Sequence, residues 1–414
     1  MANKFNFIGS IIPCKVTDSF KPYDVQKFES GWAKTSLKFN VVCGTNRHLL
    51  ESSCLTPANI KDATIYTYAR GAENSDGTKE EGRNIQVAYA DRNKPEIVAQ
   101  VPYYKKFIVD TEVPNRRNEL KNAIDAFKDG SITDETMTKL GVKTIEECEE
   151  AFKKSEKKRH EFIWEYDFVE FLNKLVNNET IKTMKFRVKG DYVLDYSNKD
   201  NRWYRHLKPT SIYRCDNDEE VESSAEFSIV FDKNAIDDSD FEETGKIHLN
   251  AYVPQYLGKP YKGIRYAPMT FNIVANKDDA KSVSMAKKMA KRFMFSDDYE
   301  GEYREHGIKV DMIDGAPIVE LTMDDLTEEQ RENIEMGWMT LDDIKRELSK
   351  PVYGEKVQDI VVTGFYTGFS TGSKETALTA DDVTVVRSEL DAPVKAETEV
   401  ELPFDEEDDD DDII

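Results

Sequence analysis

Two periodicities of apolar residues divide the chain into strand-like and helix-like stretches. Between Trp32 and Val42, apolar and polar residues alternate, so that Leu37, Phe39 and Val41 share one face. Alternation with a period of two predicts a β-strand with one buried face. Similar short stretches predict further strands at residues 4–15, 47–54, 63–69 and 84–89.

The second periodicity is helical and begins near residue 115. Leu120, Ile124 and Phe127 are spaced four and three residues apart, and Asp129-Gly130 follows them. Apolar residues at this spacing occupy one side of a helix, and a glycine is typical of a helix end. We therefore predict a helix that stops at Gly130.

A capping box predicts the start of a longer helix. Thr144 is followed three residues later by Glu147, an arrangement in which each side chain bonds the backbone of the other. We expect this helix to continue to about Trp164, with the lysine-rich run at 153–160 on its solvent face. A second apolar stripe at 168–175 predicts another helix.

A β-hairpin and a second strand-rich unit follow. Residues 183–196 and 202–214 form the predicted hairpin, and an acidic segment at 217–223 separates it from the second unit. That unit holds predicted strands at 224–231, 246–256, 261–275, 308–321 and 355–368, and predicted helices at about 279–294 and 327–349.

The two units share one organisation, in which short strands are interrupted by helices and closed by a final strand. We predict a mainly β fold with helical insertions (α+β), made of two tandem OB-like Greek-key barrels and a disordered acidic C-terminal tail. The periodicity also fits a generic β-sandwich. The expected domains are residues 1–216 with a helical insertion at about 115–178, a linker at 217–223, a second domain at 224–370, and the tail at 371–414.

Cysteines, histidines and apolar runs restrict the class of protein. The five cysteines include no CxxC pair, so we expect reduced thiols, and the five histidines lack the spacing of metal ligands. We predict no metal and no cofactor. The longest apolar runs are a few residues long, so we expect neither a membrane span nor a secretory signal. The expected location is the cytoplasm, or the host cytoplasm if the chain is phage-encoded.

The charge of the chain is acidic overall but unevenly distributed. The net charge is −23, yet residues 389–414 alone hold thirteen acidic residues and one lysine, so the other 388 residues carry −11. Residues 182–214 hold nine Lys or Arg and three Asp, a local charge of +6. Because local fields govern binding more than net charge does, a nucleic-acid ligand is compatible with this chain.

The predicted hairpin carries the main candidate site. Lys185, Arg187 and Lys189 fall on one strand face, and three neighbouring cations favour a polyanion as ligand. The partner strand places Trp203 beside Arg205. Single-stranded nucleic acids need such pairs, because bases stack on rings while phosphates contact cations. The alternative is an ordinary exposed face with lysine stems along it.

Two more segments combine rings with cations: Trp32 with Lys34 and Lys38, and the loop at 259–266. The alternatives are a tryptophan packed under a loop and a polar turn with buried tyrosines. The full set of predicted contacts to single-stranded DNA is Trp32, Lys34, Lys38, Lys185, Arg187, Lys189, Arg202, Trp203, Tyr204, Arg205, Lys208, Lys259, Tyr261, Lys262, Arg265 and Tyr266.

Enzyme motifs for nucleotide phosphates, acyl transfer and zinc proteolysis are absent from the sequence. With 80 acidic residues, carboxylate pairs arise by chance, so we predict a protein that is not an enzyme. Two other functions stay open: a structural or interaction protein, such as a virion component or DNA mimic, and a metal-dependent nuclease.

The segment FRVKGDYVLDYSNKDNRWYRHLKPTSIYR, with its strand-rich context and the acidic C-terminus, resembles single-stranded DNA-binding proteins, especially those of bacteriophages. The resemblance implies OB-folds and a role in coating single-stranded DNA during DNA replication, recombination or repair. It implies base stacking by Trp32, Trp203 and Tyr204. It implies phosphate contacts by Lys34, Lys38, Lys185, Arg187, Lys189, Arg205 and Lys208.

The acidic tail has its own predicted role, which is to modulate DNA binding and to recruit replication or recombination proteins. Bacterial relatives of the resembled family end in an acidic run followed by a Pro-Phe tip, whereas here Pro403 and Phe404 precede the acids. A partner that grips a terminal Phe would find none in this tail. The predicted partner-binding residues are Leu402, Phe404, Asp408, Asp409, Asp410, Asp411, Asp412, Ile413 and Ile414.

Overall fold

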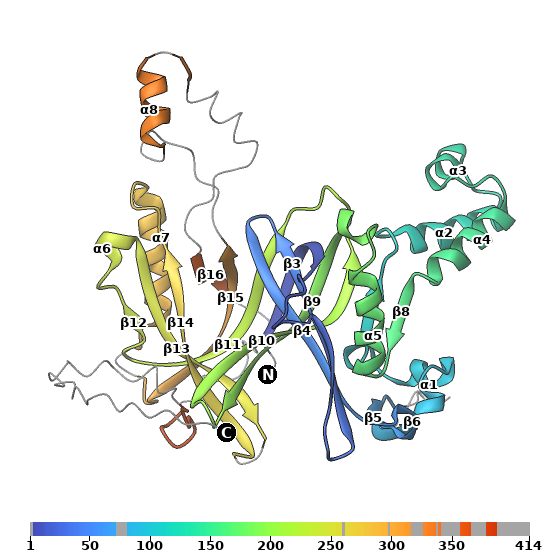
Figure 1. Cartoon of the computed structure of the whole chain (residues 1–414), viewed down its shortest axis with the longest axis horizontal. Coiled ribbons are helices and arrows are strands. Elements are labelled where there is room, and N and C mark those ends of the chain that lie inside the picture. The colour runs from blue at the N-terminus through green and yellow to red at the C-terminus, as the bar shows by residue number, and fades with distance from the viewer. Residues whose placement is uncertain are drawn as a thin grey trace, which may run out of the picture.

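Strands dominate the computed structural model, which also contains several helices (Figure 1). Fourteen strands of the described residues belong to one large sheet, and β5 and β6 pair separately. The structure describes residues 3–71, 81–258, 261–296, 299–315, 326–336, 338–340, 357–365 and 378–386.

Five strands of the N-terminal half form a first circuit. They are β1 (Asn3–Pro13), β3 (Trp32–Cys43), β4 (Asn46–Pro57), β9 (Lys185–Ser197) and β10 (Arg202–Arg214). β1 pairs antiparallel with both β3 and β9, β3 pairs with β4, and β9 pairs with β10. β10 then lies against β4. The predicted hairpin at 183–214 is confirmed.

Five strands of the C-terminal half form a second circuit with the same order. They are β11 (Glu222–Asp232), β13 (Lys246–Leu257), β14 (Gly263–Val274), β15 (Tyr303–Gly315) and β16 (Val357–Phe365). β11 pairs with β13 and β15, β13 with β14, and β15 with β16. A parallel pairing of β14 with β16 closes the circuit.

The two circuits join through β1, whose first half pairs with β11 as well as with β9. The second half of β1 turns onto β3, and Gly9 lies at this point. A Cβ at Gly9 would lie 2.1 Å from the carbonyl oxygen of Val42, so only glycine permits the close approach. A single bridge between Gly315 and Asn46 adds a second link between the circuits.

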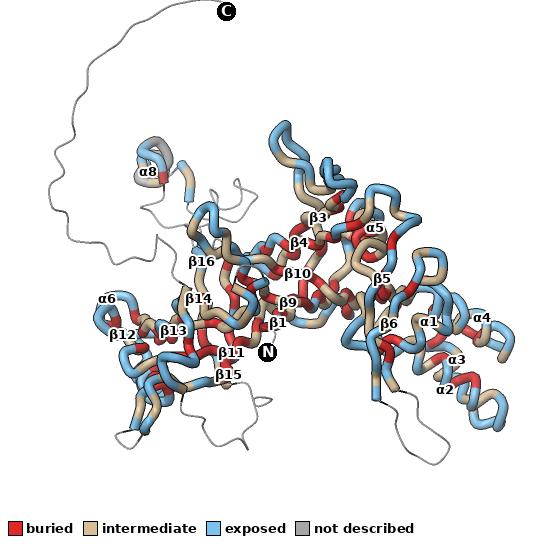
Figure 2. Tube along the Cα trace, turned by 90° about the horizontal axis from the view of Figure 1, so that it is seen from below, coloured by how far each residue is buried: buried red, intermediate tan, exposed pale blue. Residues whose placement is uncertain are grey.

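One helix packs against each circuit, and both contribute to one continuous core. α5 (Glu165–Val176) lies in the sequence between β4 and β9 and buries Phe168 and Leu172. α7 (Ala280–Ala290) lies between β14 and β15 and buries Ala286 and Ala290. Figure 2 shows that buried residues follow the strands, whereas hairpin tips are largely exposed.

A long insertion between β4 and β9 contains both strands and helices. α2 (Arg116–Asp129), α3 (Asp134–Leu140) and α4 (Ile145–Glu156) form a helical arm with a small core of its own, and Figure 1 shows it projecting from the strands. The remaining strands and α-helices of the described chain are β2 (Tyr23–Lys27), β5 (Thr64–Ala69), β6 (Arg83–Ala88), α1 (Pro95–Gln100), β7 (Phe107–Asp110), β8 (Arg159–Phe162), β12 (Ile236–Asp237), α6 (Phe241–Thr244) and α8 (Glu328–Glu335). A 3-10 turn, η3 (Tyr103–Lys105), lies between α1 and β7.

The predicted end of the capped helix at Trp164 is wrong. Thr144 does cap α4 by accepting a hydrogen bond from the Glu147 amide, but α4 ends at Glu156. Residues 159–162 form β8, which pairs with β7 about fifty residues earlier in the chain. The lysine-rich run is therefore not one solvent face, because Ser155 is buried within it. A partner distant in sequence overrides the local helical pattern here.

The C-terminal end of the described chain also differs from expectation. We expected no ordered structure after residue 370, yet residues 378–386 contact the second circuit: Leu378 forms a bridge with Tyr303, and Val385 with Tyr266. Val383 is buried. This segment therefore lies between β14 and β15, as β16 does, but contacts residues of these strands that β16 does not reach. The predicted last helix at 327–349 is too long, because α8 ends at Glu335 and residues 338–340 are not helical. Its residues 341–349, and the acidic residues after 386, lie outside the described residues.

Candidate nucleic-acid interface

The outward face of β3 and β4 interleaves cations with exposed apolar side chains. The antiparallel register places Lys34 beside Leu55 and Lys38 beside Glu51, with Trp32 at the end of the face. Trp32 is 49% exposed and Leu55 is 61% exposed. We call this surface the β3–β4 strip, defined by Trp32, Lys34, Lys38, Arg47, Leu49 and Leu55.

Three residues of the strip, Arg47, Leu49 and Leu55, are absent from the predicted set. Arg47 is exposed and pairs in register with Val42, while Leu49 is 48% exposed and pairs with Asn40. The signal that reveals them is the tight turn between the two predicted strands, because its length determines which residues lie opposite each other. The strip therefore carries three cations on β3 and β4 rather than two.

A network of charges borders the strip on β10. The Nδ1 atom of His206 lies 3.4 Å from one Glu51 carboxylate oxygen, and the Lys38 ammonium lies 3.7 Å from the same oxygen. The hydrogen bond with His206, reinforced by Lys38, lowers the pKa of Glu51 to about 2. Glu51 is thus an anion at neutral pH and partly neutralises the strip.

A groove of about 810 Å³ opens at one end of the strip, between the two circuits. Arg47 and Leu49 line it from β4, and Arg205 lines it from β10. Asp314 of β15 accepts hydrogen bonds at 3.2 Å from both Arg205 and Gln358. Asp314 therefore holds the Arg205 guanidinium at the groove and reduces the positive charge there.

The hairpin tips of β9–β10 and β13–β14 meet and bring two predicted sites together. The Tyr261 hydroxyl donates to the Asn198 side chain at 2.7 Å, which joins one tip to the other. The Arg265 guanidinium lies 5.6 Å from the Tyr261 ring, within cation–π range. We call this surface the hairpin-tip patch, defined by Arg202, Tyr204, Tyr256, Tyr261, Lys262, Ile264 and Arg265.

The exposed residues of the hairpin-tip patch include two cations, Arg202 and Lys262, as well as rings and apolar groups. Tyr256 is 74% exposed, its register partner Ile264 is 54% exposed, and Tyr204 is 39% exposed. Arg202 lies 5.5 Å from the Tyr204 ring. Tyr256 and Ile264 are absent from the predicted set, although the alternation of β13 and β14 would have placed them on the outward face.

Trp203 has a structural contact in addition to its predicted stacking role. Its indole N–H donates to the carbonyl oxygen of Val386 at 2.7 Å, and its ring meets the Tyr196 ring edge-on at 5.2 Å. Tyr266 likewise pairs through its backbone with residues 384–386. Both side chains are only partly exposed, so Tyr204 is the more accessible ring at this end of β10.

Two of the three predicted cations on β9 already have partners within the chain. The Lys185 ammonium donates to the backbone oxygens of Asn217 and Glu219, and the Arg187 guanidinium contacts Glu219 and Glu222. The acidic linker between the circuits therefore supplies the negative charge that we assigned to an external polyanion. Only Lys189 of the three is exposed.

The remaining predicted residues fall into three places. Lys208 lies 3.8 Å from Asp195 on the outward face of β10. Lys189 lines a second hollow, on the face formed by β9, β1, β11 and β15. Lys259 and the predicted tail residues lie outside the described residues.

No metal site or membrane helix emerges from the described part of the chain. Within it, no group of three or more His, Cys, Asp or Glu side chains is placed to hold a metal ion. None of its helices has the length and apolar character needed to cross a bilayer.

Comparison with known proteins adds little that bears on function. A protein-family model described as YorF matches residues 161–300, less than half of the chain, from β8 to just beyond α7. No curated protein matches. Among solved structures, the chain is similar to a deletion mutant of the single-stranded DNA binding protein from Thermus aquaticus, at 8% identity over 79% of this chain and 97% of that chain. The TM-score is 0.27, a likeness too slight to support an argument about fold or ligand.

Proposed function

We propose that this chain is a non-enzymatic protein that binds single-stranded DNA. The β3–β4 strip carries the proposal, because cations and exposed apolar groups alternate along it. Bases of a single strand stack on an aromatic ring such as Trp32 and pack against apolar side chains such as Leu55, while phosphates contact the cations. We further propose that the bound strand continues past Arg205 in the groove to the hairpin-tip patch.

The order of the strands supports an OB-like barrel for each circuit. Among the five strands of the second circuit, β11, β13 and β14 follow one another and pair in that order, and β15 returns to lie beside β11, which is a Greek-key arrangement. The fifth strand, β16, closes the ring between β14 and β15. The first circuit repeats this order. In an OB-fold the outer face of the second and third strands binds oligonucleotides, and β3 and β4 hold those two positions.

The proposed biological role is to coat and protect single-stranded DNA during DNA replication, recombination or repair, as bacteriophage proteins of this kind do. In this role the −12 segment at residues 389–414 competes with DNA for the cations and recruits partner proteins. The last described residue before this segment is Val386, and its carbonyl oxygen accepts a hydrogen bond from Trp203 of the β9–β10 hairpin. That point of exit supports a tail that reaches the hairpin-tip patch.

Fluorescence anisotropy of a labelled dT oligonucleotide and a matched duplex, at several salt concentrations, tests the proposal. We expect the single strand to bind more tightly than the duplex. The triple variant Lys34→Ala, Lys38→Ala and Arg47→Ala should bind more weakly. Its slope of log affinity against log salt should fall by about 2, because each phosphate contact on a single strand contributes about 0.7. Glu51→Gln should bind more tightly at low salt, because it frees Lys38.

A triple variant of exposed lysines elsewhere, Lys121→Ala, Lys128→Ala and Lys233→Ala, has the same change in charge and serves as the control. We expect it to keep the wild-type salt slope. Equal, weak binding of single strand and duplex would contradict the proposal and favour a structural or interaction protein. Degradation of the probe on addition of Mg²⁺ would favour a nuclease.

A further inference from the structure

A hollow of about 630 Å³ lies on the face of the sheet where the two circuits join. Its floor follows one row of the strand register: Lys189 of β9 pairs with Asn6 of β1, Asn6 pairs with Ser224 of β11, and Ser224 pairs with Asp311 of β15. Both circuits thus contribute to one concave surface. Its size is within the range of small-ligand sites.

Most charges at the rim of this hollow are paired with one another. Lys4 forms an ion pair with Asp191, and Lys309 lies 3.8 Å from Glu226. Glu222 is 3.9 Å from Arg187. Asp311 is the remaining carboxylate, and its burial next to Glu222 raises its pKa, which disfavours its ionised form.

Lys189 differs from these paired residues. It is exposed, and within the described part of the chain its ammonium group has neither an ion pair nor a hydrogen bond. An unneutralised lysine over a polar floor is the group in this hollow that attracts an anion. A phosphate suits it, because an ammonium acts on phosphate as a point charge and needs no fixed orientation.

The floor also offers an acceptor. The side-chain oxygen of Asn6 is buried and has no hydrogen-bond partner among the described residues. Buried polar atoms are nearly always hydrogen-bonded in folded proteins. Rotation of the Asn6 side chain, which lines the hollow, would bring this oxygen to a ligand N–H donor, and every nucleobase carries such donors on its edge.

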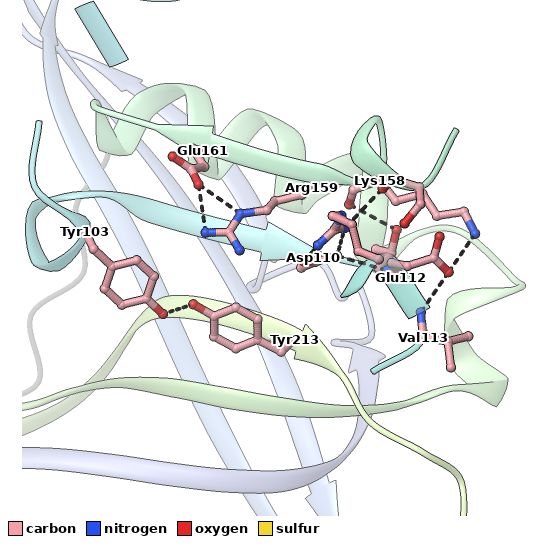
Figure 3. Close-up of polar contacts among 11 residues, drawn as sticks. Tyr103, Asp110, Glu112, Val113, Lys158, Arg159, Glu161 and Tyr213 are labelled. Carbon is pink, nitrogen blue, oxygen red and sulfur yellow. Dashed lines mark hydrogen bonds and ion pairs between the residues drawn. The ribbon is translucent and has the colours of Figure 1, made fainter. Parts of the chain in front are cut away.

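One wall of the hollow supplies a flat ring. Tyr103, in η3, is 59% exposed, and its hydroxyl contacts the hydroxyl of Tyr213 on β10 (Figure 3). This contact holds the ring at its outer end while leaving it accessible. A ring held in this way can stack with a base at a small entropic cost.

We propose that this hollow binds one nucleotide, with its phosphate on Lys189, its base edge on the Asn6 oxygen and its base against Tyr103. The inference rests on the proposed function for one of two sources of this ligand, a nucleotide within a bound single strand. The other source is a free mononucleotide, which carries the same phosphate and base. This site lies apart from the β3–β4 strip and shares no residue with it.

Isothermal titration of the full chain with deoxynucleoside monophosphates, and separately with inorganic phosphate, tests this site. We expect one mononucleotide to bind per chain and phosphate to bind more weakly. Lys189→Ala and Tyr103→Ala should each weaken binding about tenfold, because each removes one phosphate or stacking contact. Tyr103→Phe keeps the ring and should retain most of the affinity.

Lys233→Ala is the matched control, because Lys233 is an exposed lysine in the turn after β11 and lies away from the hollow. Displacement of the mononucleotide by a dT oligonucleotide would assign the site to a bound strand, and persistence of binding would assign it to free nucleotide. An absence of mononucleotide binding, or wild-type affinity in both Lys189→Ala and Tyr103→Ala, would overturn the inference. The strip variant separates this failure from that of the proposed function, because it alters oligonucleotide binding only.

Discussion

His48 illustrates, at the scale of one residue, how burial alone sets a chemical property. Its ring is fully buried, stacks on Phe7 at 4.2 Å, and bonds through Nε2 to the Ser223 hydroxyl at 2.6 Å. This burial lowers the pKa of His48 to about 4. The imidazole is therefore neutral in the folded protein at every pH at which the protein is expected to work.

This shift in the pKa of His48 makes the stability of the protein depend on pH. Between pH 6.5 and about 4, the unfolded chain binds a proton at His48 that the folded chain rejects, so stability should fall as the pH falls through this window. The contribution is about 2–3 kcal/mol. Urea unfolding at pH 7, 5.5 and 4 should show a smaller loss in His48→Gln than in wild type. The same loss in both proteins would show that His48 does not cause it.

Individual side chains also show where sequence reasoning stops. The strand pattern was sufficient to place Lys185 and Arg187 on an outward face but not to show what covers that face, nor that Trp203 packs against the core. The acidic linker contacts Lys185 and Arg187, and Val386, far along the chain, accepts the Trp203 hydrogen bond. Such contacts depend on how distant segments pack, which no local pattern encodes.

At the scale of elements, the helical arm α2–α4 is joined to the sheet by a partly buried polar cluster. Arg117 donates two hydrogen bonds to Asp110, at 2.9 and 3.0 Å, and a third to the Ser155 carbonyl oxygen. Glu112 accepts from Lys158 at 3.2 Å and from the Val113 amide at 2.9 Å (Figure 3). These bonds link β7 to both the first and the last helix of the arm.

We expect Asp110→Asn to loosen the arm without unfolding the rest of the chain. Removing one partner from a partly buried ion pair leaves Arg117 unneutralised, at a cost of about 2 kcal/mol. Hydrogen exchange of the α2–α4 amides should then accelerate by about 10- to 100-fold, since local opening governs exchange. Amides of β1 and β11 should keep their wild-type rates and act as an internal control. A uniform change across the chain would contradict a local anchor.

Elements were easier to predict than their pairings. The periodicity located most strands and helices, including α2, α5, α7 and the β9–β10 hairpin, because amphipathic patterns are local. It missed β8, which exists because β7 offers an edge far away in the sequence. It also missed the role of residues 378–386, although five of these nine residues are apolar and Val383 is buried.

At the scale of the whole molecule, the main electrostatic feature is the contrast between an acidic C-terminus and a body with cationic surfaces. We predict that deleting residues 387–414 raises the affinity for a dT oligonucleotide, most strongly at low salt, where charges interact over the longest distances. Anisotropy titrations at two salt concentrations provide the measurement. Unchanged affinity would show that the tail does not compete with DNA.

A second, longer truncation separates the effect of the tail's charge on DNA binding from the effect of residues 378–386 on stability. Deletion of 378–414 also removes the segment that bridges Tyr266 and Tyr303, so it should lower the stability of the second circuit. Deletion of 387–414 should leave that stability unchanged. Together, the two truncations separate a tail that competes with DNA from a strand-like segment that stabilises the second circuit.

The sharing of β1 between the circuits has a consequence for synthesis of the protein. β1 is synthesised well before its partners β9 and β11, which begin at Lys185 and Glu222. At ordinary rates of translation, this apolar strand waits about 10–40 s before both partners have emerged. During that interval an unpaired strand edge is exposed to aggregation or to chaperones. The first circuit can therefore close once β10 has emerged, but the edge of β1 that pairs with β11 stays uncovered until the second circuit begins to form.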